Sequence, residues 1–381
     1  MTMSTKVLPG STIGMLGGGQ LGRMFTMAAR SMGYEVIVLD PDAESPAGKL
    51  ATQHICADYT DKNALNIIAK NCDAVTTEFE NVPAATLEAL ATTCPVRPDA
   101  QAVTITQDRI HEKKFLKDNG FPTAPFSVIH SLENLQQAIK DIGTPAILKV
   151  SRFGYDGKGQ FGINQINDIE TAWQTLQGEA CVLEQRMPLD IEVSVVLARS
   201  LDGDVVTYPI AENVHEAGIL DVSIVPARID PDLASTVIDM AQRIAHALNY
   251  VGVMTVEFFI SNGELLVNEI APRPHNSGHY TLDACVTDQF EQQVRAVCGL
   301  PLGSTTLLSP VVMINMLGDI WHNGKNPDWS KLLDYPNIKL HLYGKHEARP
   351  DRKMGHYNVI AKTIDEALKL AKQTQLELNK P

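Results

Sequence analysis

The 381-residue sequence lacks a long apolar run, a surplus of positive charge and a signal peptide. No stretch approaches the roughly 20 apolar residues that span a bilayer, and residues 1–11 lack the basic and then apolar order of a leader. We therefore expect a cytoplasmic protein. The formal charge of -13 argues against a broad surface for nucleic acid or anionic membrane, so any phosphate site is expected to be local.

Paired metal-binding spacings are also missing. The six cysteines include no Cys-x-x-Cys, and no paired histidine spacing typical of zinc accompanies them. We expect reduced, mostly buried thiols. No internal repeat is evident. What the chain does have is 44% hydrophobic residues over a length sufficient for two or three domains.

The first part of the chain reads as a parallel α/β unit. Short apolar strands alternate with helical stretches, which is typical of a parallel sheet. The expected strands are Thr12–Leu16, Glu35–Leu39 and Ala74–Thr77, and the helices include Gln20–Met32. We assign this N-terminal parallel α/β domain to residues 1–107.

The remainder has a different organisation. Over residues 108–300 the expected strands are joined by turn signals, which indicates an antiparallel α+β domain. Within it, residues 123–187 are expected to form a lid. Residues 301–381 are expected to form a small β-rich domain that ends in a helix from Ile364.

Two glutamates lie on the apolar runs that flank Asn262-Gly263, and this pattern predicts a β-hairpin. A two-residue loop sets Glu257 opposite Asn268. A three-residue loop that includes Glu264 sets Glu257 opposite Glu269, and we predict this second register. Facing carboxylates repel each other unless a cation lies between them, and Mg²⁺ prefers carboxylate oxygens with water and phosphate. The pair predicts a metal-nucleotide site; the alternative is one glutamate solvated at an edge.

The first glycine-rich turn is Gly17-Gly-Gly-Gln-Leu-Gly22. It follows a strand, opens a helix and fits G-x-G-x-x-G, with Asp40 where a ribose-binding acid would fall. Taken alone, it indicates a dinucleotide enzyme. The amides of any helix N-terminus can hold another phosphate, however, and the glycines can serve packing only.

A second glycine-rich segment, Arg152–Gly159, follows the strand that carries Lys149. It is not a Walker A loop, because Lys158 precedes glycine and no helix begins there. We expect a flap over a triphosphate, with Lys158 and Lys149 neutralising charge. The alternative is a mobile hairpin with a solvated lysine. Lys149 lies between apolar neighbours, and lysine is seldom buried without a partner.

A third segment, Cys181–Pro188, is an apolar strand that runs into a proline-containing bend. Such a segment can offer backbone groups to a purine edge and Met187 to its face. Glu192 opens the next strand and is either a ribose contact or simply exposed.

Several longer motifs occur together with these features. They are Gly17–Met24, Thr77–Val82, Phe153–Gly159, Tyr208–His215, Asn268–His279 and Arg349–His356. Together they resemble the carboxyaminoimidazole ribonucleotide synthase (PurK) family of the ATP-grasp superfamily, from about Thr12 to about Ile360. The resemblance implies an ATP-grasp fold with an N-terminal parallel α/β domain and a small C-terminal β-rich domain.

The resemblance also implies a reaction and its cofactors. In that family ATP phosphorylates bicarbonate to carboxyphosphate, whose carboxyl group passes to the amine of aminoimidazole ribonucleotide, with release of ADP and phosphate. The implied cofactors are ATP and Mg²⁺, with two ions expected, and a homodimer is usual. Nucleic acid and membrane partners are not expected.

Residue roles follow from the same resemblance. The implied nucleotide contacts are Arg109, Lys149, Gly154, Tyr155, Asp156, Gly157, Lys158, Gly159, Glu184, Gln185, Arg186, Met187, Glu192, His215, Asn268 and Glu269. Glu257 and Glu269 are the implied metal ligands. The implied ribonucleotide contacts are Gly19, Gln20, Leu21, Glu78, Tyr155, Asp156, Lys158, Arg273, His275, Asn276, Ser277, Lys345 and Arg352. Lys149, Asp156, Lys158 and Arg273 are the expected catalytic residues, with Asp156 orienting or deprotonating the amine.

Three rival functions stay open at this point. A nicotinamide-dependent oxidoreductase would explain the first glycine turn but not the paired glutamates. Another ATP-grasp carboxylate-amine ligase would share most of the motifs, and His275-Asn276-Ser277 and Glu78-Phe-Glu-Asn81 favour the imidazole substrate over it. A non-catalytic nucleotide-binding module would be expected to have lost Lys149 or a metal ligand.

Overall fold

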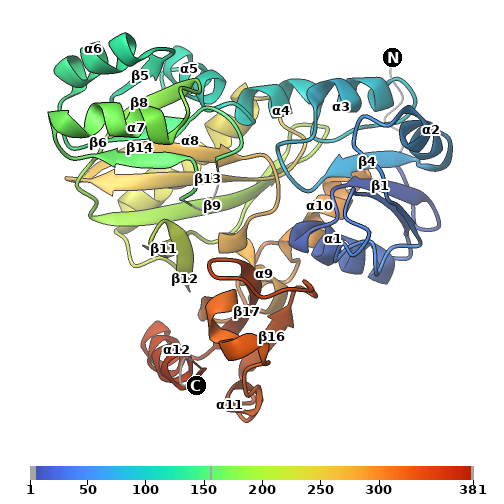
Figure 1. The fold of residues 1–381 in the computed structure, drawn as a ribbon. Helices are drawn as coiled ribbons and strands as arrows, with labels where there is room; N and C mark the ends of the chain where they lie inside the picture. The colour runs from blue at the N-terminus through green and yellow to red at the C-terminus, as the bar shows by residue number, and fades with distance from the viewer. Residues whose placement is uncertain (1–5, 155–156, 379–381) are drawn as a thin grey trace.

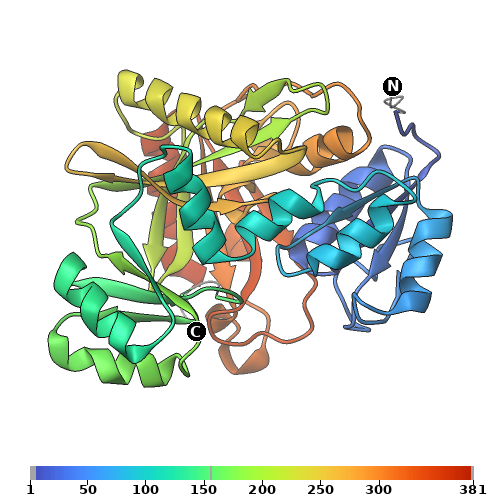
Figure 2. The same cartoon turned by 90° about the horizontal axis from the view of Figure 1, so that it is seen from above.

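The computed structural model describes residues 6–154 and 157–378, and over them the chain forms three β-sheets (Figures 1 and 2). Figure 1 shows the N-terminal sheet on one side, a small sheet on the other and a long sheet that runs between them and down to the C-terminal strands. No helix in this described part is long and apolar enough to cross a membrane.

The N-terminal sheet is parallel, as predicted, with the order β3-β2-β1-β4. Its strands are β1 (Thr12–Leu16), β2 (Glu35–Leu39), β3 (Gln53–Ile55) and β4 (Ala74–Thr77), and its helices are α1 (Gln20–Ser31), α2 (Lys62–Asn71), α3 (Ala84–Ala91) and α4 (Ala100–Thr106). Strand β1 buries four of its five residues, because helices cover both faces of a parallel sheet.

The small sheet is antiparallel and has the order β5-β8-β6-β7. Its strands are β5 (Phe126–Ile129), β6 (Ala146–Val150), β7 (Gln160–Ile163) and β8 (Cys181–Gln185). Helices α6 (Leu132–Ile142) and α7 (Ile169–Thr175) cover one face through Leu148 and Leu183. Because side chains alternate along a strand, Lys149 and Glu184 point to the opposite face.

The long sheet has the order β14-β13-β9-β11-β12-β15-β17-β16, with β10 beside β9. Its strands are β9 (Ile191–Arg199), β10 (Val205–Thr207), β11 (Ala211–Glu216), β12 (Ile219–Val225), β13 (Gly252–Ser261), β14 (Glu264–Ala271), β15 (Val311–Leu317), β16 (Ile338–Leu342) and β17 (Lys353–Ile360). Strand β12 pairs with β15, so the C-terminal strands continue the central sheet without a break.

Helices fasten the units to one another. Two of them are α5 (Arg109–Asp118) and α10 (Gln289–Val297). The others, α8 (Pro231–Ala247), α12 (Ile364–Leu378) and the short α9 (Thr281–Ala284) and α11 (Ser330–Leu333), accompany the long sheet. Helix α10 completes the core of the N-terminal unit, since its Phe290 and Val294 pack with Phe25 of α1. Asp108 caps α5 by accepting from the amides of Ile110 and His111.

The hairpin of β13 and β14 corrects one prediction and confirms another. The three-residue loop is wrong, because Ser261 pairs with Glu264 and leaves Asn262-Gly263 as the loop. Both loop residues have positive φ, 50° and 78°, as a type I′ turn requires. Glu257 nevertheless pairs with Glu269, as predicted. A β-bulge at Asn268 supplies the extra residue that the shorter loop omits.

Candidate active site

The face of the small sheet opposite to α6 and α7 carries a buried network of charges. Glu184 on β8 lies 3.1 Å from Lys149 on β6 and 3.2 Å from Lys113 on α5. The side chains of Glu184 and Lys113 are almost wholly inaccessible, and Lys149 keeps 12% of its side chain exposed. Lys149 is therefore the member of the network that can reach a ligand.

The network holds Glu184 in its charged form. Burial alone would raise the pKa of Glu184, but the cations Lys149, Lys113 and Arg109 lower it to about 2. Burial lowers the pKa of Lys149, and Glu184 opposes that shift. A buried carboxylate that ties two lysines in place keeps the ammonium group of Lys149 aimed into the cleft.

Replacing Glu184 by glutamine is expected to reduce the free energy of unfolding at pH 7 by about 3 kcal/mol, because two buried lysines lose their counter-charge. The folded pKa of about 2 lies below the ordinary 4.5, so the carboxylate's contribution is complete above pH 4.5 and lost as the pH falls towards 2. Chemical denaturation of both proteins at pH 7 and pH 3 tests this. A difference that does not shrink at pH 3 would contradict it.

The paired glutamates form the second part of the site. The bulge places Asn268 and Glu269 together opposite Glu257, and all three side chains are half-buried. Burial and the charge of Glu269 raise the pKa of Glu257 to about 7. His275 approaches Glu257 from the side, with 3.1 Å between Nε2 and Oε1. Since the Ser277 amide donates to His275 Nδ1, the ring hydrogen is on Nε2 and points at Glu257.

These groups fit a hard divalent cation. The described residues include no cluster of three or more metal-ligating His, Cys, Asp or Glu side chains, so the pair offers two carboxylates only. Mg²⁺ is commonly held in this way, with water and phosphate oxygens completing its coordination. Among the described groups, the buried Oδ1 of Asn268 has no hydrogen-bond partner, and it lies beside the pair. A cation would both separate the carboxylates and satisfy this oxygen.

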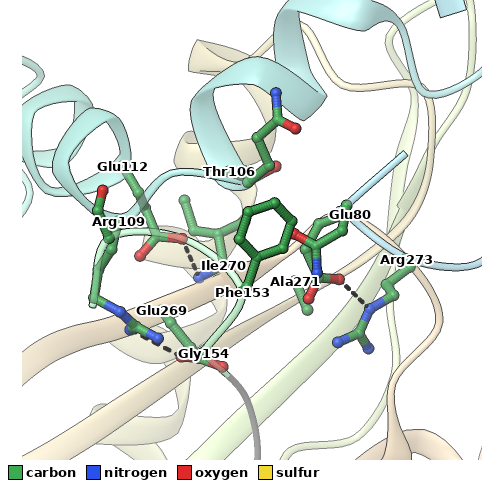
Figure 3. A pocket seen from close by; sticks show the side chains of 13 residues that line it. Glu80, Thr106, Arg109, Glu112, Phe153, Gly154, Glu269, Ile270, Ala271 and Arg273 are labelled. Carbon is green, nitrogen blue, oxygen red and sulfur yellow. Dashed lines mark hydrogen bonds and ion pairs between the residues drawn. The ribbon is translucent and has the colours of Figure 1, made fainter. Parts of the chain in front are cut away.

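A polar pocket opens next to the pair and encloses about 490 Å³, part of it open to solvent (Figure 3). Figure 3 shows Arg109 reaching Glu269 and Arg273 reaching Glu80 from opposite walls. The distances are 3.3 Å and 2.8 Å. Burial would raise the pKa of Glu80, but Arg273 lowers it overall, so this pair is ionised. Two guanidinium groups thus flank one pocket.

The predicted ribose contact and its neighbour also lie together. Glu192 on β9 and His215 on β11 are 2.6 Å apart between Oε2 and Nδ1. Burial would lower the pKa of His215, but Glu192 and Glu257 raise it overall. The two residues are half-buried and close to the metal pair.

The segment predicted to contact a purine, residues 181–188, offers fewer free backbone groups than expected. The amides of Gln185 and Arg186 donate to the carbonyls of Pro125 and Pro145. The edge of a purine would therefore have to bond to backbone groups that follow Arg186, near Met187, which is half-buried.

The glycine-rich segment predicted to act as a flap connects β6 to β7. Gly154 lines the pocket, and Gly157 and Gly159 have φ of 75° and 71°, which side chains rarely adopt. A Cβ on Gly157 would lie 3.1 Å from the Ala217 carbonyl, so the tip contacts the turn between β11 and β12. Lys158 is exposed, and Tyr155 and Asp156, both predicted site residues, lie outside the described residues.

The backbone amides of the first glycine-rich turn bond to carboxylate side chains of the protein itself. The amides of Gly19 and Gly22 donate to Glu78, and the amide of Gly18 donates to Asp40. A Cβ on Gly17 or Gly19 would collide with Glu78. The amides that a dinucleotide phosphate would use are thus occupied, and this favours the alternatives to the oxidoreductase.

The predicted phosphate clamps, Lys345 and Arg352, lie in the connection between β16 and β17. Lys345 donates to Gln20 at 2.7 Å, and although burial raises the pKa of nearby Glu78, the charge of Lys345 opposes that rise. Leu21, the next residue after Gln20 in the sequence, is half-buried. Arg352 is half-buried and donates to the carbonyl of Glu347 at 2.9 Å. Gln20, Glu78 and Lys345 therefore gather where the N-terminal and C-terminal units meet.

Sequence reasoning missed several charged residues at the site. Lys113 lies four positions after Arg109 on the same face of α5, and this spacing was the available signal. Lys353 on β17 lies close enough to oppose the rise in the pKa of Glu257 and to add to the fall that burial causes in the pKa of His275. Asn276 and Ser277, in contrast, are buried, and Ser277 bonds to Ser194 and His275.

Known families account for most of the chain. The ATP-grasp domain model matches residues 114–290, the ribonucleotide synthetase preATP-grasp domain model matches residues 10–107, and the phosphoribosylaminoimidazole carboxylase C-terminal domain model matches residues 311–370. Of the site residues named in this section, only Arg109 and Lys113 fall outside these matches.

Individual relatives match over nearly the whole length. The N5-carboxyaminoimidazole ribonucleotide synthase of Bacillus subtilis is 44% identical over 367 residues, covering 96% of this chain and 95% of its own. That of Brucella melitensis is 46% identical, covering 92% and 97%. Among solved structures, an N5-carboxyaminoimidazole synthase from Aspergillus clavatus in complex with ADP and 5-aminoimidazole ribonucleotide has a TM-score of 0.90 at 31% identity, with 100% of both chains covered. An ADP complex of such a synthetase reaches 0.93 at 42% identity, covering 98% of this chain and 99% of that one.

Proposed function

The chain belongs to the N5-carboxyaminoimidazole ribonucleotide synthase family of ATP-grasp ligases, and we propose from this membership and from its cleft how its own residues serve the reaction. The reaction is the ATP-dependent carboxylation of 5-aminoimidazole ribonucleotide in purine biosynthesis. The observation that carries the proposal is the convergence of Lys149, the paired glutamates and two guanidinium groups on one cleft.

ATP would lie between the small sheet and the long sheet. Lys149 would neutralise its phosphates from β6, and Arg109 would do so from the start of α5. Glu184 and Lys113 would hold these cations in place. Glu192 would take a ribose hydroxyl, with His215 beside it. Phosphoryl transfer depends mainly on such positioning and charge neutralisation.

Glu257 and Glu269 would hold Mg²⁺, with Asn268 as a further oxygen donor. The metal would draw phosphate charge away from the transferred group when it is bound. His275 would keep its hydrogen bond to Glu257 and so fix the direction of that carboxylate.

The carboxyl transfer would take place beside Arg273, at the end of the cleft that faces Glu78, Gln20 and Lys345. Arg273 is fixed by Glu80 from the N-terminal unit, so both units contribute to one wall. We propose bicarbonate as the acceptor of the phosphoryl group. The flap from Gly154 to Gly159 would exclude water, which otherwise destroys carboxyphosphate.

The experiment that tests this function is phosphate release from ATP, measured with and without 5-aminoimidazole ribonucleotide and bicarbonate. We expect release to require Mg²⁺ and bicarbonate and to be fastest with all components present. Release that another acid supports equally well, with an amine other than the ribonucleotide, would favour a different ATP-grasp ligase.

Replacing Arg352 by alanine is expected to raise the KM for the ribonucleotide at least about tenfold, because a charge-assisted contact is worth roughly 1.5 to 3 kcal/mol. The KM for ATP should change little, since Arg352 lies on the C-terminal side of the cleft. Steady-state kinetics with each substrate varied gives both constants, and Arg349→Ala, an exposed neighbour, is the control. Equal loss for both substrates would assign Arg352 to the fold instead.

Three further assignments complete the proposal. We propose a homodimer, a cytoplasmic location and a division of the chain near residues 107 and 300. The division is supported by the change from parallel to antiparallel pairing and by the family matches, although the sheet itself runs on from β12 to β15.

A further inference from the structure

We propose that Glu112 and Lys113, consecutive residues of α5, are positioning residues that hold β14 in the bulged register on which the metal pair depends. This inference rests on the metal site proposed above. It concerns residues that the sequence did not single out and whose side chains are almost wholly buried.

Strand β14 is the edge strand of the long sheet, so the outward backbone groups near its end have no neighbouring strand. Helix α5 supplies partners for two of them. Lys113 Nζ donates to the Asn268 carbonyl at 2.9 Å, and the Ile270 amide donates to Glu112 Oε2 at 3.1 Å. Figure 3 shows Glu112 meeting Ile270 beside Glu269. The two contacts bracket Glu269 on both sides.

Both residues are buried, so their polar groups are available to these internal contacts and not to solvent. The side chain of Lys113 is fully inaccessible, and Glu112 is 3% exposed. Burying polar or charged groups is unfavourable unless each is bonded to a partner, and burial raises the pKa of the Glu112 carboxyl to about 8. Lys113 is also 3.2 Å from Glu184, so the same ammonium group joins the nucleotide network of β8 to the bulge of β14.

One alternative strand register competes with the bulged register that these contacts select. The two-residue loop, continued without a bulge, would pair Glu257 with Asn268, as Phe258 pairs with Val267. That slip would turn Glu269 to the other face of the sheet. In the slipped strand, the Asn268 carbonyl and the Ile270 amide would no longer face Lys113 and Glu112. The helix therefore stabilises the bulged register over the slipped one.

The test compares Glu112→Leu with Glu112→Gln, which keeps an acceptor for the Ile270 amide. Lys113→Met removes the second contact, and Lys114→Met is the matched control on the exposed face of α5. The probe is Mn²⁺, whose binding is followed by electron paramagnetic resonance in the presence of ADP. Calorimetry gives ADP affinity without metal, and thermal unfolding reports the fold.

We expect Glu112→Leu and Lys113→Met to weaken Mn²⁺ binding at least about tenfold, a loss of roughly 1.4 kcal/mol. Glu112→Gln and Lys114→Met should stay within about threefold of the unchanged protein, and metal-free ADP binding should hardly change in Glu112→Leu. If Lys113→Met does not fold, the comparison of the two Glu112 variants decides alone.

A lower unfolding temperature with unchanged Mn²⁺ affinity in Glu112→Leu would overturn the inference and leave a purely structural role. Glu269→Gln separates this from failure of the metal site. If Glu269→Gln loses Mn²⁺ and Glu112→Leu does not, only the positioning role falls. If Glu269→Gln keeps Mn²⁺, the metal site itself is wrong and the inference falls with it.

Discussion

Replacing Glu269 by glutamine is expected to lower the rate of ATP turnover at least about a hundredfold, because a bound metal is worth several kcal/mol of transition-state stabilisation. The same change removes one of two facing charges. Without metal, the unfolding temperature should therefore hold or rise. Both results come from one protein, through turnover at fixed Mg²⁺ and thermal unfolding in the presence of a chelator.

The control for this prediction is Glu264→Gln, an exposed glutamate at the loop end of the same strand. This variant should change neither the rate of ATP turnover nor the metal-free unfolding temperature. Full turnover in Glu269→Gln would remove the metal assignment. Loss of turnover together with a lower metal-free unfolding temperature would indicate that Glu269 supports the hairpin, through Arg109, more than it binds a cation.

The second large effect is expected at Lys149. Lys149→Met should lower kcat/KM for ATP at least about a hundredfold, because the side chain that can reach the phosphates loses its charge in a site with little water. Lys140→Met, on the exposed face of α6 behind the same sheet, is the control. Steady-state kinetics with ATP varied gives the result.

A double variant separates catalysis from folding at Lys149. Lys149→Met also removes a partner of Glu184, which keeps its contact with Lys113. Combining it with Glu184→Gln leaves buried Lys113 without its counter-charge, so the double variant should be less stable than Lys149→Met and should recover none of the lost turnover. Recovery of turnover in the double variant would mean that Lys149 acts only by neutralising Glu184.

Much of the fold could be predicted because it depends on short-range patterns. The strand limits of β1, β2, β4, β6 and β8 follow from apolar runs and turn residues. The pairing of Glu257 with Glu269 was predicted correctly, although the loop was not. The loop is one residue shorter than predicted, and the bulge at Asn268 compensates for the missing residue. An asparagine in a strand carries no signal for a bulge, because the bulge is set by α5, more than 150 positions away.

The charged residues of α5 were missed for a related reason. Glu112 and Lys113 read as ordinary polar helix positions, and their burial is decided by β14 and β8. The glycine turn shows the opposite case. Its pattern correctly predicts amides at a helix start, but the pattern cannot show that Glu78, 56 residues after Gly22, occupies them.

The unbroken ladder from β12 to β15 has a consequence for how the two proposed substrate sites are related. Four residue pairs join β15 to the central sheet. The connection between β16 and β17, which carries Lys345 and Arg352, lies at the far end of this ladder. The paired glutamates lie on β13 and β14 of the same sheet, so one continuous set of backbone hydrogen bonds fixes the distance between the proposed metal site and the proposed ribonucleotide site.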